Sequence, residues 1–89
     1  MAKFEIKDGV AIIPMGTTKI EEKAFCGETS LECVVIPIGV TEIGKFAFEG
    51  CTSLTTVILP FSVNIIGKDA FDGCSRLTKI YVPENMVDY

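Results

Sequence analysis

The chain has 89 residues, of which 48% are hydrophobic and 22% charged, with a formal net charge of −4. This length suits one small domain, and the hydrophobic fraction is far too high for a disordered chain. The acidic balance argues against nucleic acid as a partner, because binding phosphate requires a basic face. No apolar run approaches the roughly 18 residues of a membrane-spanning helix, so we expect no membrane insertion. Histidine is absent, which removes the commonest general base and metal ligand.

The first predicted element is a β-hairpin over residues 4–13. Residues 4–7 alternate apolar and polar side chains, Asp8-Gly9 follows, and residues 10–13 form a second apolar run. Two such runs joined by Asp-Gly are a strong hairpin signal. We therefore expect residues 1–13 to form an N-terminal cap together with the first strand.

The rest of the chain repeats with a period of 23 residues. Five kinds of position keep this period, and a repeat of this length is typical of solenoid proteins. Five columns that share one period do not arise by chance. The columns are Pro14, Pro37, Pro60 and Pro83; Ile20, Ile43 and Ile66; the pairs Ala24-Phe25, Ala47-Phe48 and Ala70-Phe71; Gly27, Gly50 and Gly73; and Leu31, Leu54 and Leu77.

Each repeat contains a short predicted strand that ends at its proline. In residues 54–60 the alternation points Val57 and Leu59 one way and Ile58 the other. Proline ends the strand because it has no amide hydrogen to donate to the next ladder bond. The equivalent strands are expected at residues 11–13, 34–36 and 80–82.

The other half of each repeat is expected to turn back towards the next strand. Residues 43–48 are too few for a full helix, so we expect a helical turn or a short 3₁₀ element there. One turn cannot bury its own apolar face, so successive turns must stack and form internal ladders of isoleucine, phenylalanine and leucine. Three repeats occupy residues 14–83, and residues 84–89 are a remnant of a cap that would leave the last turn poorly covered.

The predicted fold class is a repeat solenoid of stacked turns. Short parallel β-strands form one face, and short helical or 3₁₀ turns and loops form the other. The repeat unit resembles the BspA-like leucine-rich repeats, a 23-residue variant. The resemblance is most specific in residues 63–77, which read V-x-x-I-G-x-x-A-F-x-G-C-x-x-L, and in residues 40–54, which keep the same pattern.

The first repeat departs from this pattern in residues 17–31. Thr17 replaces the valine, Glu21 replaces the glycine and Glu28 replaces the cysteine. We interpret this repeat as a degenerate, capping unit. The resemblance implies a leucine-rich-repeat solenoid, and proteins of this family are often bacterial cell-surface adhesins or binding scaffolds. It brings no catalytic residues with it.

The four cysteines are expected to be structural or solvent-facing thiols. Cys51 and Cys74 share a column, which would place them on adjacent turns within disulfide range, but we expect reduced thiols packed as small hydrophobic groups. Cys26 and Cys33 lie off that column and are expected at the rim or in solvent. No C-x-x-C spacing exists and no histidine could complete a zinc site. We assign no catalytic, cofactor-binding or metal-binding residue.

The candidate partner-binding residues lie in two apolar columns. One column is sent outward by strand alternation, and the other follows the prolines at a position that is usually polar in BspA-like repeats. Side by side, the columns would make a contiguous apolar surface suited to a protein contact, unless loops or the cap fold over it. The candidates are Ile12, Val35, Ile58 and Tyr81 from the strands, and Met15, Ile38 and Phe61 after the prolines.

These observations predict a non-enzymatic protein-interaction or scaffold module with an unidentified protein partner and no cofactor. Two alternatives stay open: a self-assembling unit that forms a homo-oligomer, and a fragment of a bacterial cell-surface adhesin. A small enzyme is disfavoured, because no histidine is present to activate a serine or cysteine. The absence of a signal peptide predicts the cytoplasm if the chain is complete, and the resemblance predicts the cell surface if it is a fragment.

Overall fold

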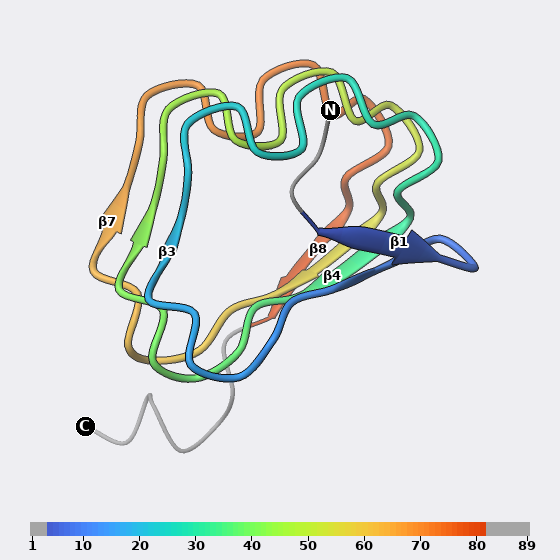
Figure 1. The fold of residues 1–89 in the computed structure, drawn as a ribbon. Helices are drawn as coiled ribbons and strands as arrows, with labels where there is room; N and C mark the ends of the chain where they lie inside the picture. Colours follow the sequence, from blue (N-terminus) through green and yellow to red (C-terminus); the bar gives the residue numbers. More distant parts are fainter. Residues whose placement is uncertain (1–3, 82–89) are drawn as a thin grey trace.

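The computed structural model describes residues 4–81, which form a coil of stacked turns (Figure 1). Within this range the secondary structure is eight short strands, and none of these residues belongs to a helix that could cross a bilayer. The strands are β1 (Glu5–Lys7), β2 (Val10–Ile12), β3 (Lys19–Ile20), β4 (Cys33–Val35), β5 (Glu42–Ile43), β6 (Thr56–Ile58), β7 (Ile65–Ile66) and β8 (Lys79–Tyr81).

The larger sheet has the strand order β1-β2-β4-β6-β8. Its last four strands are parallel, and equivalent repeat positions lie side by side, so that Val34 pairs with Val57 and Val57 with Ile80. The predicted strands are confirmed, although β2, β4 and β8 each begin and end one residue earlier than expected, and β6 is shorter than the predicted residues 54–60. Inward Val57 is fully buried while outward Ile58 is half-buried, as the alternation predicts.

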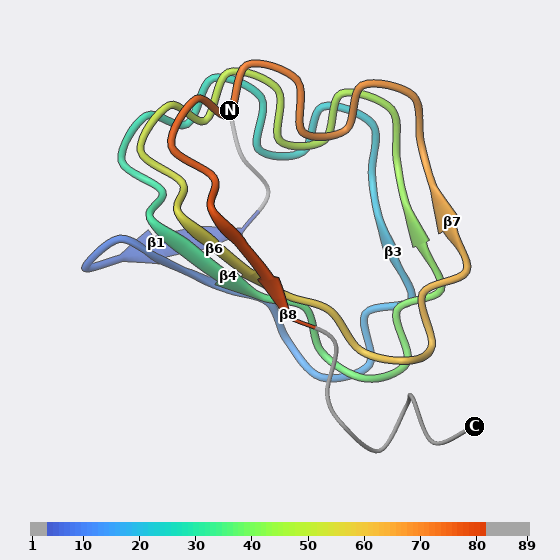
Figure 2. The ribbon, with the colours of Figure 1, turned by 180° about the vertical axis from the view of Figure 1, so that it is seen from behind.

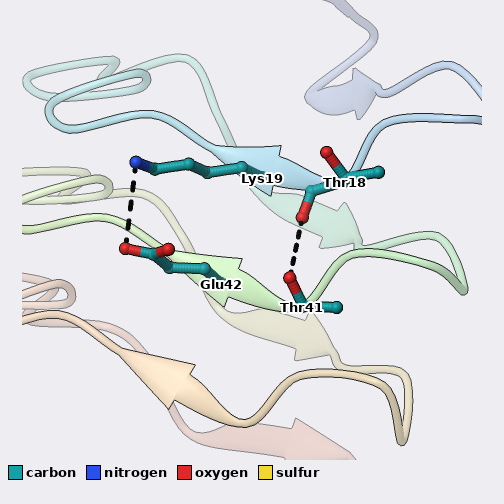
Figure 3. Close-up of polar contacts among 4 residues, drawn as sticks. All are labelled: Thr18, Lys19, Thr41 and Glu42. Atoms are coloured by element: carbon teal, nitrogen blue, oxygen red, sulfur yellow. Dashed lines mark hydrogen bonds and ion pairs between the residues drawn. The ribbon is translucent and has the colours of Figure 1, made fainter.

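A second sheet, of order β3-β5-β7, lines another side of the coil. It corrects the expectation that only helical turns and loops lie there. Figure 3 shows how β3 and β5 are linked: the Thr41 hydroxyl donates to the Thr18 carbonyl at 3.3 Å, and the Lys19 ammonium lies 3.9 Å from the Glu42 carboxylate. That ion pair is exposed and adds little stability. Strands of two residues are too short for alternation to reveal them in the sequence.

The segment after β5 forms a chain of tight turns, with no helix. The Ala47 amide donates to the Gly44 carbonyl and the Glu49 amide to the Phe46 carbonyl, both at 3.2 Å. Phe46 has a φ of 57°, in the left-handed region, and the equivalent Lys23 and Asp69 have φ values of 61° and 56°. A left-handed residue in each loop prevents successive helical hydrogen bonds. Other amides of these loops donate to the adjacent turn. The Phe48 amide, for example, donates to the Ala70 carbonyl at 2.7 Å.

The core is built from the predicted ladders. The rings of Phe25 and Phe48 stack with centroids 5.1 Å apart and planes 4° apart, and Phe48 stacks on Phe71 at 5.2 Å and 2°. The isoleucines and leucines of the first two turns are fully buried beside them. Because the columns repeat in register, identical side chains lie above one another and each turn buries the face of its neighbour.

The glycine column and the cysteine column explain why the first repeat departs from the pattern of the others. A Cβ atom on Gly44 would lie 2.6 Å from the Glu22 backbone nitrogen, so the glycine is needed where a turn packs closely on the preceding one. The Cys51 thiol likewise reaches back one turn and donates to the Phe25 carbonyl at 3.0 Å. Residues 4–13 form a hairpin in place of a preceding turn. Glu21 and Glu28 therefore stand where no such close approach or thiol bond is required.

The two ends of the coil differ. At the N-terminal end, β1 and β2 form the predicted hairpin around Asp8 and Gly9, whose φ values of 52° and 80° are those of a type I′ turn. Phe4 from this hairpin stacks on Phe25 at 5.6 Å and covers the first turn. Figure 2 is seen from the other end, where the last turn faces the viewer. Here Ile66 and Ile80 are about half exposed. Residues 84–89, predicted as a cap remnant, lie outside the described residues.

Candidate protein-interaction surface

The outward strand column lies on the larger sheet. Val35, Ile58 and Tyr81 are paired in register across β4, β6 and β8. Val35 and Tyr81 are exposed and Ile58 is half-buried. Ile12 at the end of β2 is exposed as well. The parallel register therefore sets these side chains in a row, one from each turn.

The post-proline column runs beside this row, at the ends of the strands. Met15 is 74% exposed, and Ile38 and Phe61 are each 52% exposed. Of the preceding prolines, Pro14 is exposed, Pro37 is half-buried and Pro60 is buried. The fourth member of the column, Glu84, lies outside the described residues. Large apolar side chains at this position are exposed because the chain has just left the sheet and turns away from the core.

The two columns meet in an apolar groove of about 320 Å³ between the second and third turns. Four of the seven candidate residues line it: Val35 and Ile58 from the strands, and Ile38 and Phe61 from the loops. The remaining candidates, Ile12, Met15 and Tyr81, do not line this groove. The other four lining residues were not among the candidates. Two are inward-facing strand positions and two belong to the proline column: Ile36 and Leu59, and Pro37 and Pro60.

A polar column borders the other end of the strands. The Thr55 amide donates to the Glu32 carbonyl at 2.9 Å and its hydroxyl to the same carbonyl at 3.2 Å. The Thr78 amide bonds to the Thr55 carbonyl at 3.1 Å in the next turn. These side chains are tied to backbone of the adjacent turn, so this border is a rigid structural element that limits the apolar surface.

All four cysteines are free thiols. Cys51 is buried and Cys74 half-buried, and each donates to a phenylalanine carbonyl one turn back, Cys74 to Phe48 at 3.1 Å. Burial raises the pKa of the Cys51 thiol from 9.0 to about 12, and burial also raises the pKa of Cys74. Protonated thiols held this way are poor nucleophiles and poor metal ligands. Cys26 is exposed and Cys33 half-buried.

No cluster of candidate metal ligands is found in the described part of the chain. Among residues 4–81, no three histidine, cysteine, aspartate or glutamate side chains gather closely enough to hold a metal ion. Asp69 and Asp72 are exposed on the loops of the last turn. The described surface does carry the apolar groove and the two columns that form it.

This geometry defines a β-solenoid of short parallel strands with an exposed strand face. A family model described as "BspA type Leucine rich repeat region (6 copies)" matches residues 7–89, so the chain belongs to that family. Membership agrees with the predicted repeat and suggests a protein-interaction or adhesin-like module. A search of curated proteins and a search of solved structures each gave no match.

Proposed function

We propose that the chain is a non-enzymatic binding module that recognises a protein partner through its strand face and post-proline column. The partner is a protein segment that inserts one or two large apolar side chains into the groove between the second and third turns. The contact residues are Ile12, Met15, Val35, Ile38, Ile58, Phe61 and Tyr81.

The groove is the observation that carries this proposal. Its lining consists of valine, isoleucine, leucine, proline and phenylalanine, and its volume of about 320 Å³ is at the lower end of the range for ligand-binding sites. Such a volume suits an apolar side chain of a partner, with the flanking columns packed around it. A contiguous apolar surface of this kind is a common mark of protein contacts.

The shape of the surface also favours a partner with an extended contact. The columns cross several turns, and the backbone beneath them is fixed by the parallel ladder between β4 and β6. A rigid surface loses little conformational entropy on binding, which leaves more of the contact energy as affinity. Phe61 and Ile38 stand at the groove and are the expected anchors, because energetic hot spots concentrate in well-packed, desolvated pockets.

The test is a selection of binders followed by titration against matched variants. Peptides from a displayed random library are selected on the folded chain, and their affinities are measured by isothermal titration calorimetry. Phe61→Asp should weaken binding at least about 30-fold, the loss expected for a hot spot. Ile65→Asp is the matched control, because Ile65 is exposed to the same degree but lies on the second sheet.

The proposal is supported if selected peptides carry large apolar residues, lose affinity on Phe61→Asp and keep it on Ile65→Asp. It is overturned if the selected binders respond to Ile65→Asp and ignore Phe61→Asp. Circular dichroism of both variants establishes that each is folded before the affinities are compared.

A further inference from the structure

The outward face of the larger sheet carries two rows of side chains. In β2, β4 and β6 the middle residue is buried while the first and third are accessible, so both outer residues of each strand point away from the core. The parallel register sets these residues in two rows. The small row consists of Val10, Cys33 and Thr56, and the large row consists of Ile12, Val35 and Ile58.

The centre of this face carries no charge. The Thr56 hydroxyl lies 3.3 Å from the Thr55 hydroxyl, within hydrogen-bonding distance, so its polar atom already has a partner. Cys33 is a free thiol, which packs as a small hydrophobic group. The three most accessible members of the rows are 39% to 49% exposed. An uncharged, accessible patch of this kind matches the centre of protein interfaces, where charged residues are depleted.

The first strand of the sheet extends both rows with charges of opposite sign. Lys7 pairs with Val10 and continues the small row, whereas Glu5 pairs with Ile12 and continues the large row. Both charged side chains are exposed. The two rows therefore differ in size along their whole length and in charge at β1.

We propose that two copies of the chain pack these faces together in a two-fold symmetric dimer whose axis runs along the rows. Such an axis sets each strand opposite the same strand of the other copy and exchanges the two rows. Large side chains then face small ones, which lets the two sheets interdigitate at the usual spacing of about 10 Å. The facing pairs are Val10 with Ile12, Cys33 with Val35, and Thr56 with Ile58.

The charges select this axis over the alternative. With the rows exchanged, Glu5 of each copy lies opposite Lys7 of the other, which makes two attractive pairs. An axis parallel to the strands would keep each row against itself and reverse the strand order. Lys7 would then face Lys79, which continues the small row on β8. Complementary charges fix the register of a contact more than they add affinity.

The contact is small, which predicts a dimer that dissociates on dilution. A standard interface buries ~800 Å² per partner and uses about 20–30 residues on each side. The two rows and the β1 charges supply fewer residues than that, so the contact belongs to the weaker class. Val35 and Ile58 also line the groove. The dimer therefore masks part of the proposed partner site, and a bound partner should release single chains.

The experiment measures solution mass by analytical ultracentrifugation over a hundredfold range of concentration at low ionic strength. The wild type is expected to move from the mass of one chain towards that of two and no further. Glu5→Lys turns both attractive pairs into repulsive ones and should weaken dimerisation at least about fivefold. The double variant Glu5→Lys with Lys7→Glu restores both pairs with their signs exchanged, so it should dimerise as the wild type does.

A second pair of variants tests the apolar centre. Val35→Lys places a charge in the middle of the contact and should stay at the mass of one chain. Ile65→Lys is the matched control, since Ile65 is similarly exposed but lies on the second sheet, and it should dimerise normally. Circular dichroism establishes that both variants are folded.

The proposal is overturned by a wild type of one chain mass at every concentration or by growth beyond two chains. It is also overturned by a dimer that Glu5→Lys leaves intact, or by a weakened dimer that the double variant does not restore. Neither Glu5 nor Lys7 lines the groove, so Glu5→Lys should leave the affinity of groove-binding peptides for single chains unchanged. Failure of the dimer and failure of the proposed function are therefore distinguishable.

Discussion

Phe25 and Phe71 occupy the same column at opposite ends of the coil, and their burial differs. Phe25 lies between the rings of Phe4 and Phe48, so it is fully buried, whereas among the described residues Phe71 stacks only on Phe48, and it is partly accessible. The residue type and the loop geometry are the same. Whether a core residue of a solenoid is buried therefore depends on the layer next to it. At the first turn, a hairpin with one aromatic side chain is enough to bury Phe25.

The largest effect is expected in the middle of the phenylalanine ladder. Phe48→Ala removes a ring that is buried between two others, and it should lower the free energy of unfolding by about 3–5 kcal/mol. Phe71→Ala, made in the same column of the last described turn, should cost less than half of that, because Phe71 is only partly buried. Urea denaturation followed by circular dichroism compares the two variants. Equal losses contradict the interpretation that Phe71 contributes less buried surface than Phe48.

The glycine column tests the same idea through the backbone. Gly44→Ala would place a Cβ atom 2.6 Å from the Glu22 nitrogen, and forcing the turns apart should cost about 1–3 kcal/mol. Glu21→Ala is made in the same column of the first turn, where the wild type already carries a large side chain. It should change stability by less than about 0.5 kcal/mol, which is typical of surface substitutions. A Gly44→Ala variant as stable as the wild type contradicts the close approach of the turns.

Removing the cap should make the first turn resemble the last. Phe4→Ala takes away the ring that stacks on Phe25 at 5.6 Å, and we expect a loss of about 1–2 kcal/mol, since Phe4 is only partly buried. Thermal unfolding followed by circular dichroism measures the loss. Lys7→Ala in the same hairpin is the control, because Lys7 is exposed and should leave the melting temperature almost unchanged.

The smallest expected effect on stability comes from ionisation of the cysteine thiols. Their rates of chemical labelling also show how well each turn is protected. Cys26 should react first with iodoacetamide near neutral pH and Cys51 only after unfolding, because burial raises the pKa of Cys51 to about 12. The unfolded thiol ionises near 9.0, so the folded state binds the proton more tightly and stability should fall as pH rises above 9. Mass spectrometry of labelled peptides gives the order, and rapid labelling of Cys51 in the folded chain contradicts it.

Much of the fold could be predicted because a repeat makes each physical requirement visible several times. The columns of proline, isoleucine, Ala-Phe and leucine identify strand ends and core positions, and all of the predicted ladders are present. The second sheet could not be predicted, because a two-residue strand such as Lys19–Ile20 shows no alternation. Residues 43–48, predicted as a helical turn or a short 3₁₀ element, form tight turns without a 3₁₀ helix, because Phe46 takes the left-handed conformation that this residue type rarely adopts.

The exposed side chains of the candidate surface could be predicted from the sequence, and the groove between them could not. Alternation and the proline column identified the exposed members such as Val35 and Phe61. They could not show that Ile36 and Leu59, both buried core residues, also form the floor of a groove between turns. That feature depends on the spacing of adjacent loops, which no single repeat encodes.

The most direct test of the difference between the two ends is amide hydrogen exchange, measured by nuclear magnetic resonance. The account predicts that amides of β4 and β6 exchange slowly, because each of these strands lies between two parallel neighbours. Amides of β8 should exchange faster, because all three residues of this strand are exposed. Amides of β8 that are as protected as those of β6 in dilute solution would contradict the account.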